Sequence, residues 1–163
     1  MSRDLGLVCR AVLLVTIVGW LLPASVESQE PARNRVFGEA LGPGLVYSIN
    51  YERDFSGRVG WRIGIGGLPA SGFQYVLGLG MATVRVGEGR HAMYAGLGGG
   101  VFWARDVWLF ERTDVWAGYL IASFGYQLKP WREGFLVRLS YTPLANAEGI
   151  ALLWGGLAVG WEF

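Results

Sequence analysis

Apolar residues alternate with small or polar residues along most of the chain after residue 35. The alternation is clearest at 45–55, where Leu45, Tyr47, Ile49, Tyr51 and Phe55 take the odd positions and Val46, Ser48, Asn50, Glu52 and Asp54 the even ones. A period of two places these sets on opposite faces of a β-strand. The same pattern predicts strands at 36–41, 45–55, 59–67, 73–86, 91–103, 115–128, 135–142 and 151–163. After residue 30 we find no helical periodicity of useful length.

The segments between these strands divide into two sets. Turns at 55–58, 87–90 and 129–134 are expected on one side with both chain ends, and turns at 42–44, 68–72, 104–114 and 143–150 on the other. Residues 42–44 read Gly-Pro-Gly, and proline removes a ladder hydrogen bond, so this triplet is interpreted as a turn. Without it the strands would number seven, whereas an even number of antiparallel strands returns both chain ends to the same side.

The segment 104–114 allows two arrangements because its alternation has no clear phase. It is either an open loop, or the flanking strands continue as a tall hairpin with residues 111–114 at the tip. Its apolar side chains Trp108 and Phe110 also allow two interpretations. They rest on the outer leaflet, which we favour because lipid is close by, or they form a contact patch for a partner.

The composition explains why the sheet should lie in a membrane. Hydrophobic residues make up 52% of the chain and charged residues only 17%, while 14% aromatic residues exclude a disordered glycine-rich chain. In hydrocarbon every backbone polar group must be paired, and a sheet achieves this only by closing. We therefore predict that residues 29–163 form an all-β, eight-stranded antiparallel transmembrane β-barrel, an up-and-down meander. The formal net charge of +1, without basic runs, gives no reason to expect nucleic acid.

Residues 1–28 have the features of a secretory signal peptide. Arg3 and Arg10 precede an apolar run at 11–22, and Val26 and Ser28 supply small residues for cleavage after residue 28. The alternative, an uncleaved anchor helix, needs about 20 apolar residues and would have to extend across Arg10. We therefore expect export into the periplasm and insertion into a bacterial outer membrane.

Five polar residues share the parity opposite to the predicted lipid-facing side chains: Glu39, Asn50, Glu52, Arg62 and Arg138. An eight-stranded barrel encloses only enough space for side chains, so these charges should pair across the lumen. Such a network is either a gate or proton path, or a structural polar plug. We favour the plug.

Aromatic residues cluster toward the predicted strand ends, as in interfacial girdles. The expected periplasmic girdle is Tyr51, Phe55, Trp61, Phe135, Trp161 and Phe163, and the expected outer girdle is Trp103, Trp116 and Trp154.

The chain resembles a family of small, mostly uncharacterised bacterial outer-membrane barrels, distantly similar to the OmpA and OmpX type. The resemblance rests on residues 47–53 (YSINYER), 125–130 (GYQLKP) and 134–143, with Gly134-Phe135, Arg138 and Thr142-Pro143, and on the terminal GWEF. It implies the barrel fold, an outer-membrane location and no established ligand. The ending, with Trp161 and Phe163, is similar to the insertion signal read by the barrel-assembly machinery. Gln127 departs from the arginine expected there, which puts a complete charge ladder in doubt.

These features favour a structural or adhesive barrel without enzymatic activity, with outer-membrane lipid and the assembly machinery as partners. One alternative is an outer-leaflet lipid-modifying enzyme, but the only histidine, His91, is expected with Ser56 and Glu88 at the periplasmic edge. The other is a conduit for small hydrophobic solutes, which a filled lumen disfavours. We expect no cofactor, and a single histidine with no cysteine after Cys9 cannot build a closed zinc site.

Overall fold

The computed structural model describes most of the chain beyond the predicted signal peptide. The described residues are 33–55, 58–69, 73–87, 89–106, 113–131, 134–146, 149–151 and 154–163. The signal peptide proposed for 1–28 lies outside them and stays a prediction. None of the helices among the described residues has the length and apolar character needed to cross a membrane.

Eight antiparallel strands form a closed barrel. They are β1 (Asn34–Leu41), β2 (Tyr47–Asp54), β3 (Val59–Pro69), β4 (Phe73–Val86), β5 (His91–Asp106), β6 (Thr113–Leu128), β7 (Phe135–Tyr141) and β10 (Gly155–Glu162). Each pairs with the next in this order, and β10 returns to β1, with Val36 opposite Trp161. Closure pairs each of these strands on both sides over at least part of its length, and residues 113–119 of β6 pair only with β5. The predicted eight-stranded up-and-down barrel is confirmed.

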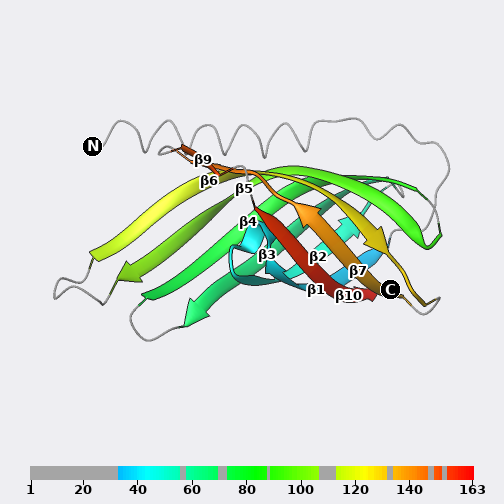
Figure 1. Cartoon of the computed structure of the whole chain (residues 1–163), viewed down its shortest axis with the longest axis horizontal. Coiled ribbons are helices and arrows are strands. Elements are labelled where there is room, and N and C mark those ends of the chain that lie inside the picture. The colour runs from blue at the N-terminus through cyan, green and yellow to red at the C-terminus, as the bar shows by residue number, and fades with distance from the viewer. Residues whose placement is uncertain are drawn as a thin grey trace.

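The wall of the barrel is much taller on one side than on the other. Strands β4, β5 and β6 have 14, 16 and 16 residues, whereas β1, β2 and β10 have 8 each and β7 has 7. Figure 1 shows the long green and yellow strands extending well past the short ones, away from the C-terminus. We call β3–β6 the tall wall and β7, β10, β1 and β2 the short wall.

The tall hairpin arrangement of 104–114 is confirmed, because β5 and β6 stay paired up to Asp106 opposite Thr113. The tip predicted at 111–114 is partly wrong, since Thr113 and Asp114 belong to β6. Residues 107–112 lie outside the described residues, so nothing tests the placement of Trp108 and Phe110.

The predicted loop at 143–150 is wrong in part. It contains a small hairpin of β8 (Leu144–Asn146) and β9 (Gly149–Ala151), and β8 pairs with β6. Pro143 has no N–H for a sheet ladder, so the strand breaks there and resumes at Leu144, opposite Ile121, in the same register along β6. The carbonyl of Pro143 still accepts from the Ala122 N–H at 3.2 Å. The strand predicted at 151–163 begins at Gly155.

The alternating apolar residues face outward, as predicted, on the short wall and on β3 and β5. On the short wall, for example, Ile49 of β2 and Leu139 of β7 are each 64% exposed. On β4 this expectation is wrong. There the large apolar side chains point inward, Leu77 being 1% exposed, while Gly78 and Gly80 face outward. Large apolar residues alternating with glycine suit either orientation here, because β4 contributes to a part of the lumen that is packed with apolar side chains.

Candidate functional site

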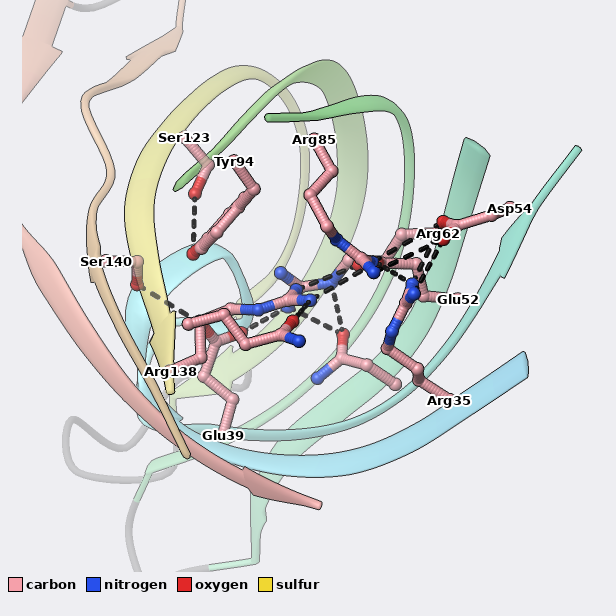
Figure 2. Close-up of polar contacts among 12 residues, drawn as sticks. Arg35, Glu39, Glu52, Asp54, Arg62, Arg85, Tyr94, Ser123, Arg138 and Ser140 are labelled. Carbon is pink, nitrogen blue, oxygen red and sulfur yellow. Dashed lines mark hydrogen bonds and ion pairs between the residues drawn. The ribbon is translucent and has the colours of Figure 1, made fainter. Parts of the chain in front are cut away.

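Ten buried polar side chains fill the half of the lumen at the end where β1 begins and β10 ends, and they come from β1, β2, β3, β4 and β7. This end is the one predicted to face the periplasm, so we call it the periplasmic end and the other the outer end. In Figure 2 the labelled arginines and carboxylates point toward one another inside the barrel. Two groups lie at different heights. The Glu52 cluster comprises Arg35, Glu52, Asp54, Arg85 and Arg138, and the Glu39 cluster comprises Glu39, Ser48, Asn50, Arg62 and Ser140.

In the Glu52 cluster one carboxylate accepts from three guanidiniums. Glu52 Oε1 lies 2.8 Å from Arg35 Nη1 and 2.9 Å from Arg85 Nη2, and Glu52 Oε2 lies 2.8 Å from Arg138 Nη1. Arg35 also donates to Asp54, with Nη2 2.6 Å from Oδ2. Glu52 and Asp54 lie two residues apart on β2, so the pleat points both inward.

The Glu39 cluster lies nearer the outer side and is held by Arg62. The guanidinium of Arg62 forms an ion pair with Glu39, and its Nε donates to Asn50 Oδ1 at 3.0 Å. Asn50 in turn donates from Nδ2 to Ser48 Oγ at 2.9 Å. The hydroxyl of Ser140 on β7, two strands away from β1 around the barrel, donates to Glu39 Oε1 at 3.3 Å. The cluster therefore ties β1, β2, β3 and β7 across the lumen.

Opposite charges balance within this buried space. Four arginines (Arg35, Arg62, Arg85 and Arg138) face four carboxylates (Glu39, Glu52, Asp54 and Glu162), and at the rim Lys129 also contacts Glu162. Burying charges is costly unless they are paired, so the balance is a condition for a folded barrel. Among the described residues, the buried Arg62 Nη1, Arg85 Nε and Arg138 Nε have no hydrogen-bond partner.

Aromatic rings separate and cover the guanidiniums. Phe37 is 1% exposed and lies between Arg62 and Arg138, whose guanidinium carbons are 4.8 and 4.6 Å from its ring centre. Arg138 also stacks on Tyr94 at 4.2 Å. These cation–π contacts partly compensate Arg138 for its Nε, which has no hydrogen-bond partner among the described residues. The arrangement fills the lumen with side chains and leaves its described carboxylates bonded to arginine.

The structure brings together all five residues for which we predicted a lumen network. Sequence reasoning missed Arg35 and Asp54, although each shares the parity of a predicted member of its strand. It missed Arg85 because β4 was assigned the wrong face. Thr83 and Arg85 share the parity of Met81, and these two polar residues signalled that this face is the inner one.

Gln127 and Glu162 complete the periplasmic half. Gln127 Oε1 accepts from Arg138 Nη2 at 2.8 Å, so an acceptor stands where an arginine would have added another positive charge. Glu162 Oε2 accepts from Arg35 Nε at 2.7 Å, although Glu162 is the second-last residue of the chain. The end of β10 is therefore fastened to the lumen network through its one acidic side chain.

The outer half of the lumen is apolar. Seven buried residues pack together there: Tyr75, Leu77, Leu79, Met81, Ala104, Tyr119 and Ile121. Leu45, Leu68, Phe102 and Leu144 pack against them. Their strands place this group above the Glu39 cluster, so the barrel interior has a charged lower layer and an apolar upper layer.

The turn η1 (Gly42–Gly44) folds into the barrel mouth over this apolar layer. All three of its residues are buried. Tyr119 on the opposite wall donates its hydroxyl to the Pro43 carbonyl at 3.1 Å, and the Trp154 indole donates to the Gly42 carbonyl at 2.7 Å. The inward path requires positive φ at Leu41 (61°) and Leu45 (63°). The predicted turn is therefore an internal plug.

The aromatic girdles are present with one correction. Tyr51 and Trp61 pack with ring centres 5.4 Å apart near the periplasmic end, and Trp103 and Trp116 with centres 6.5 Å apart near the outer end. Trp154 does not complete the outer girdle, because its indole is partly buried on η1. The position of Trp154 along its predicted strand cannot show that a nearby turn supplies a buried carbonyl for its indole.

Trp161 and Phe163 face outward from the end of β10, 47% and 66% exposed. The backbone of Phe163 exchanges two hydrogen bonds with Asn34, at 2.9 and 3.0 Å, which closes the barrel at the periplasmic rim. His91 is exposed and its Nδ1 contacts the Tyr126 hydroxyl. Ser56 and Glu88, the residues considered as its partners, lie outside the described residues.

The chain matches no protein-family model and no curated protein sequence. Solved structures with a similar fold include the following three. The N-terminal β-barrel domain of Pseudomonas aeruginosa OprF is 15% identical over 84% of this chain and all of that one, with a TM-score of 0.68. Ail, the attachment invasion locus protein of Yersinia pestis, is 18% identical over 83% of this chain and all of its own, with a TM-score of 0.54. Neisserial surface protein A is 9% identical over 80% and 94%, with a TM-score of 0.50. The chain therefore has the fold of the small eight-stranded outer-membrane barrels.

Proposed function

We propose that this protein is an integral outer-membrane β-barrel that acts through its cell-surface face, in a structural or adhesive role, without enzymatic activity. The observation that carries this proposal is the filled lumen. Two ion-paired clusters occupy its lower half, and an apolar layer with the η1 plug occupies its upper half. The described side chains occupy both halves, which favours a function at the outer and lipid-facing surfaces over transport through the lumen.

The outer-membrane location is supported by three features. Apolar residues cover the outward face of both walls, including Ile65, Leu97 and Leu157, each more than half exposed. The N-terminal segment has the charge and length of an export signal. The similar folds belong to outer-membrane proteins. Residues Trp161 and Phe163 are proposed to be read by the barrel-assembly machinery during insertion.

An adhesive role is supported by the height of the tall wall. The β5–β6 hairpin extends beyond the short wall, and residues 107–112 connect its two strands in the sequence. These residues read VWLFER and include Trp108 and Phe110, for which we predict contact with lipid or with a partner. Ail, one protein of similar fold, is named for attachment.

Two measurements test the proposal in order. The first compares the gel mobility of boiled and unboiled protein from an outer-membrane fraction, where we expect a heat-modifiable band. The second measures adherence of cells that display the protein. In the test variant, Asn-Gly replaces residues 107–112, a two-residue turn that closes the hairpin at the Asp106–Thr113 pair.

The shortened hairpin should keep the heat-modifiable band and lose adherence to epithelial cells and to immobilised matrix protein. The control is Trp131→Gln, which removes an aromatic residue that is 61% exposed in the turn at the opposite end. It should leave adherence unchanged. Adherence that survives the shortened hairpin would refute the adhesive role, and absence of the band from the outer membrane would refute the location itself.

A further inference from the structure

A hollow of about 530 Å³ opens on the outward face of the tall wall. Its lining is almost wholly apolar and consists of Ile65, Val76, Leu77, Gly78, Val101, Trp103 and Trp116. Gly78 forms the floor, since it pairs with Ile65 on one side and Val101 on the other. Trp103 and Trp116 stand opposite each other on β5 and β6 and bound the hollow toward the outer side.

The floor of this hollow is bare backbone that the barrel itself does not require. A Cβ added at Gly78 or Gly80 would meet no atom within 4 Å. At Gly98, which faces the lumen, an added Cβ would lie 2.6 Å from Met81 Cα, so glycine is needed there for packing. Glycine in the interior of a strand is destabilising unless something approaches its backbone closely. The two outward glycines of β4 therefore leave room for an external group.

The rim of the hollow shows what kind of group fits. Arg105 lies two residues beyond Trp103 on β5, and its guanidinium carbon is 4.8 Å from the Trp103 ring. The paired indoles of Trp103 and Trp116 mark the level of lipid headgroups. Arg105 thus places a cation at the level of the lipid headgroups, and the apolar hollow lies below it at the level of the acyl chains. This arrangement is complementary to an amphiphile with an acyl tail and an anionic head.

We propose that this hollow binds one acyl chain of a phosphate-bearing lipid of the outer leaflet, and that Arg105 contacts the lipid phosphate. The inference rests on the proposed membrane location. A second copy of the chain fits less well. Two copies in one membrane related by a two-fold axis would bring two Arg105 side chains to the same height at the contact, and like charges repel.

Native mass spectrometry of the full chain folded in non-ionic detergent tests the proposal. The probes are phosphatidylglycerol and phosphatidylcholine with identical acyl chains, added in equal amounts. We expect the wild type to retain one lipid and to prefer phosphatidylglycerol. Gly78→Leu fills the hollow and should lower retention of both lipids several-fold. Arg105→Gln should reduce the preference for phosphatidylglycerol by about fivefold while the chain still binds.

Ala82→Leu is the matched control, because Ala82 is an exposed residue on the same face of β4, four positions from Gly78 toward the periplasm. It adds the same side chain outside the hollow and should leave lipid retention unchanged. Equal retention by Gly78→Leu and Ala82→Leu would overturn the site, and an unchanged preference in Arg105→Gln would overturn the phosphate contact. A dimer that Gly78→Leu abolishes would assign the hollow to a second copy.

Failure of the proposed function gives a different result from failure of this site. Each variant is first run boiled and unboiled, and all should show the heat-modifiable band. If the wild type lacks that band in detergent, the barrel proposal fails. If the band is present and lipid retention is the same in every variant, only the lipid site fails.

Discussion

Replacing Glu52 with glutamine removes the carboxylate at the centre of the Glu52 cluster. Its two oxygens accept four hydrogen bonds of 2.8 to 3.2 Å from three arginines. Glutamine keeps one acceptor oxygen and turns an amide NH₂ toward guanidinium donors. Two charge-assisted bonds at about 1.5–3 kcal/mol each are then lost, and an unbalanced positive charge stays buried.

We therefore expect Glu52→Gln to lower the free energy of unfolding by about 3–5 kcal/mol, the usual cost of removing one partner of a buried ion pair. Urea titration of the protein in phospholipid vesicles, followed by tryptophan emission and linear extrapolation, measures this change. Arg53→Gln is the control. Arg53 is the exposed neighbour on β2, so its loss should change stability by no more than about 0.5 kcal/mol.

A second substitution tests the cause of the loss. Arg85→Gln in the Glu52→Gln background restores the charge balance, so the double variant should be about 1–2 kcal/mol more stable than the sum of the two single losses. A loss below about 1 kcal/mol for Glu52→Gln alone would refute the reasoning, because exposed, water-screened ion pairs have that magnitude. The lumen would then be hydrated.

Three further predictions concern the barrel end, the plug and the glycine beside it. Deleting Phe163 should sharply reduce the heat-modifiable band in outer-membrane fractions, and a normal amount would contradict the assembly role. Tyr119→Phe removes the hydrogen bond to Pro43 and should cost about 0.5–1.5 kcal/mol in urea titration, with no loss if the plug is held only by packing. Gly100→Ala places a Cβ 2.6 Å from Tyr119 Cζ and should cost about 1–3 kcal/mol, whereas a neutral result would show that the ring can move aside.

The short wall could be predicted from the sequence because its two faces differ in kind. On β2 the outward residues from Tyr47 to Tyr51 are apolar or aromatic, with the exposed Arg53 at the end, and the inward ones, such as Asn50 and Glu52, are polar or charged. Only one orientation places these inward polar residues away from lipid. The same alternation places Arg62 and Arg138 in the lumen.

The orientation of the tall wall is harder to predict from the sequence, because the residues on both faces of β4 are mostly apolar or small. Alternation there marks a strand without marking its inner face. Only the two polar residues near its periplasmic end, Thr83 and Arg85, break the symmetry. The inward fold of η1 could not be predicted either, because it depends on hydrogen bonds from Tyr119 and Trp154, which lie far away in sequence.

The unequal walls have a consequence for the membrane around the barrel. At about 3.3 Å per residue and a tilt of about 45°, the 8-residue strands of the short wall span only about 19 Å along the bilayer normal, and the 16-residue strands about 37 Å. The hydrocarbon core of a bilayer is about 30 Å thick, so either the bilayer becomes thinner beside the short wall or the whole barrel tilts. In either case, lipids beside the short wall meet a different surface from lipids beside the tall wall. The protein would impose a one-sided deformation on its bilayer.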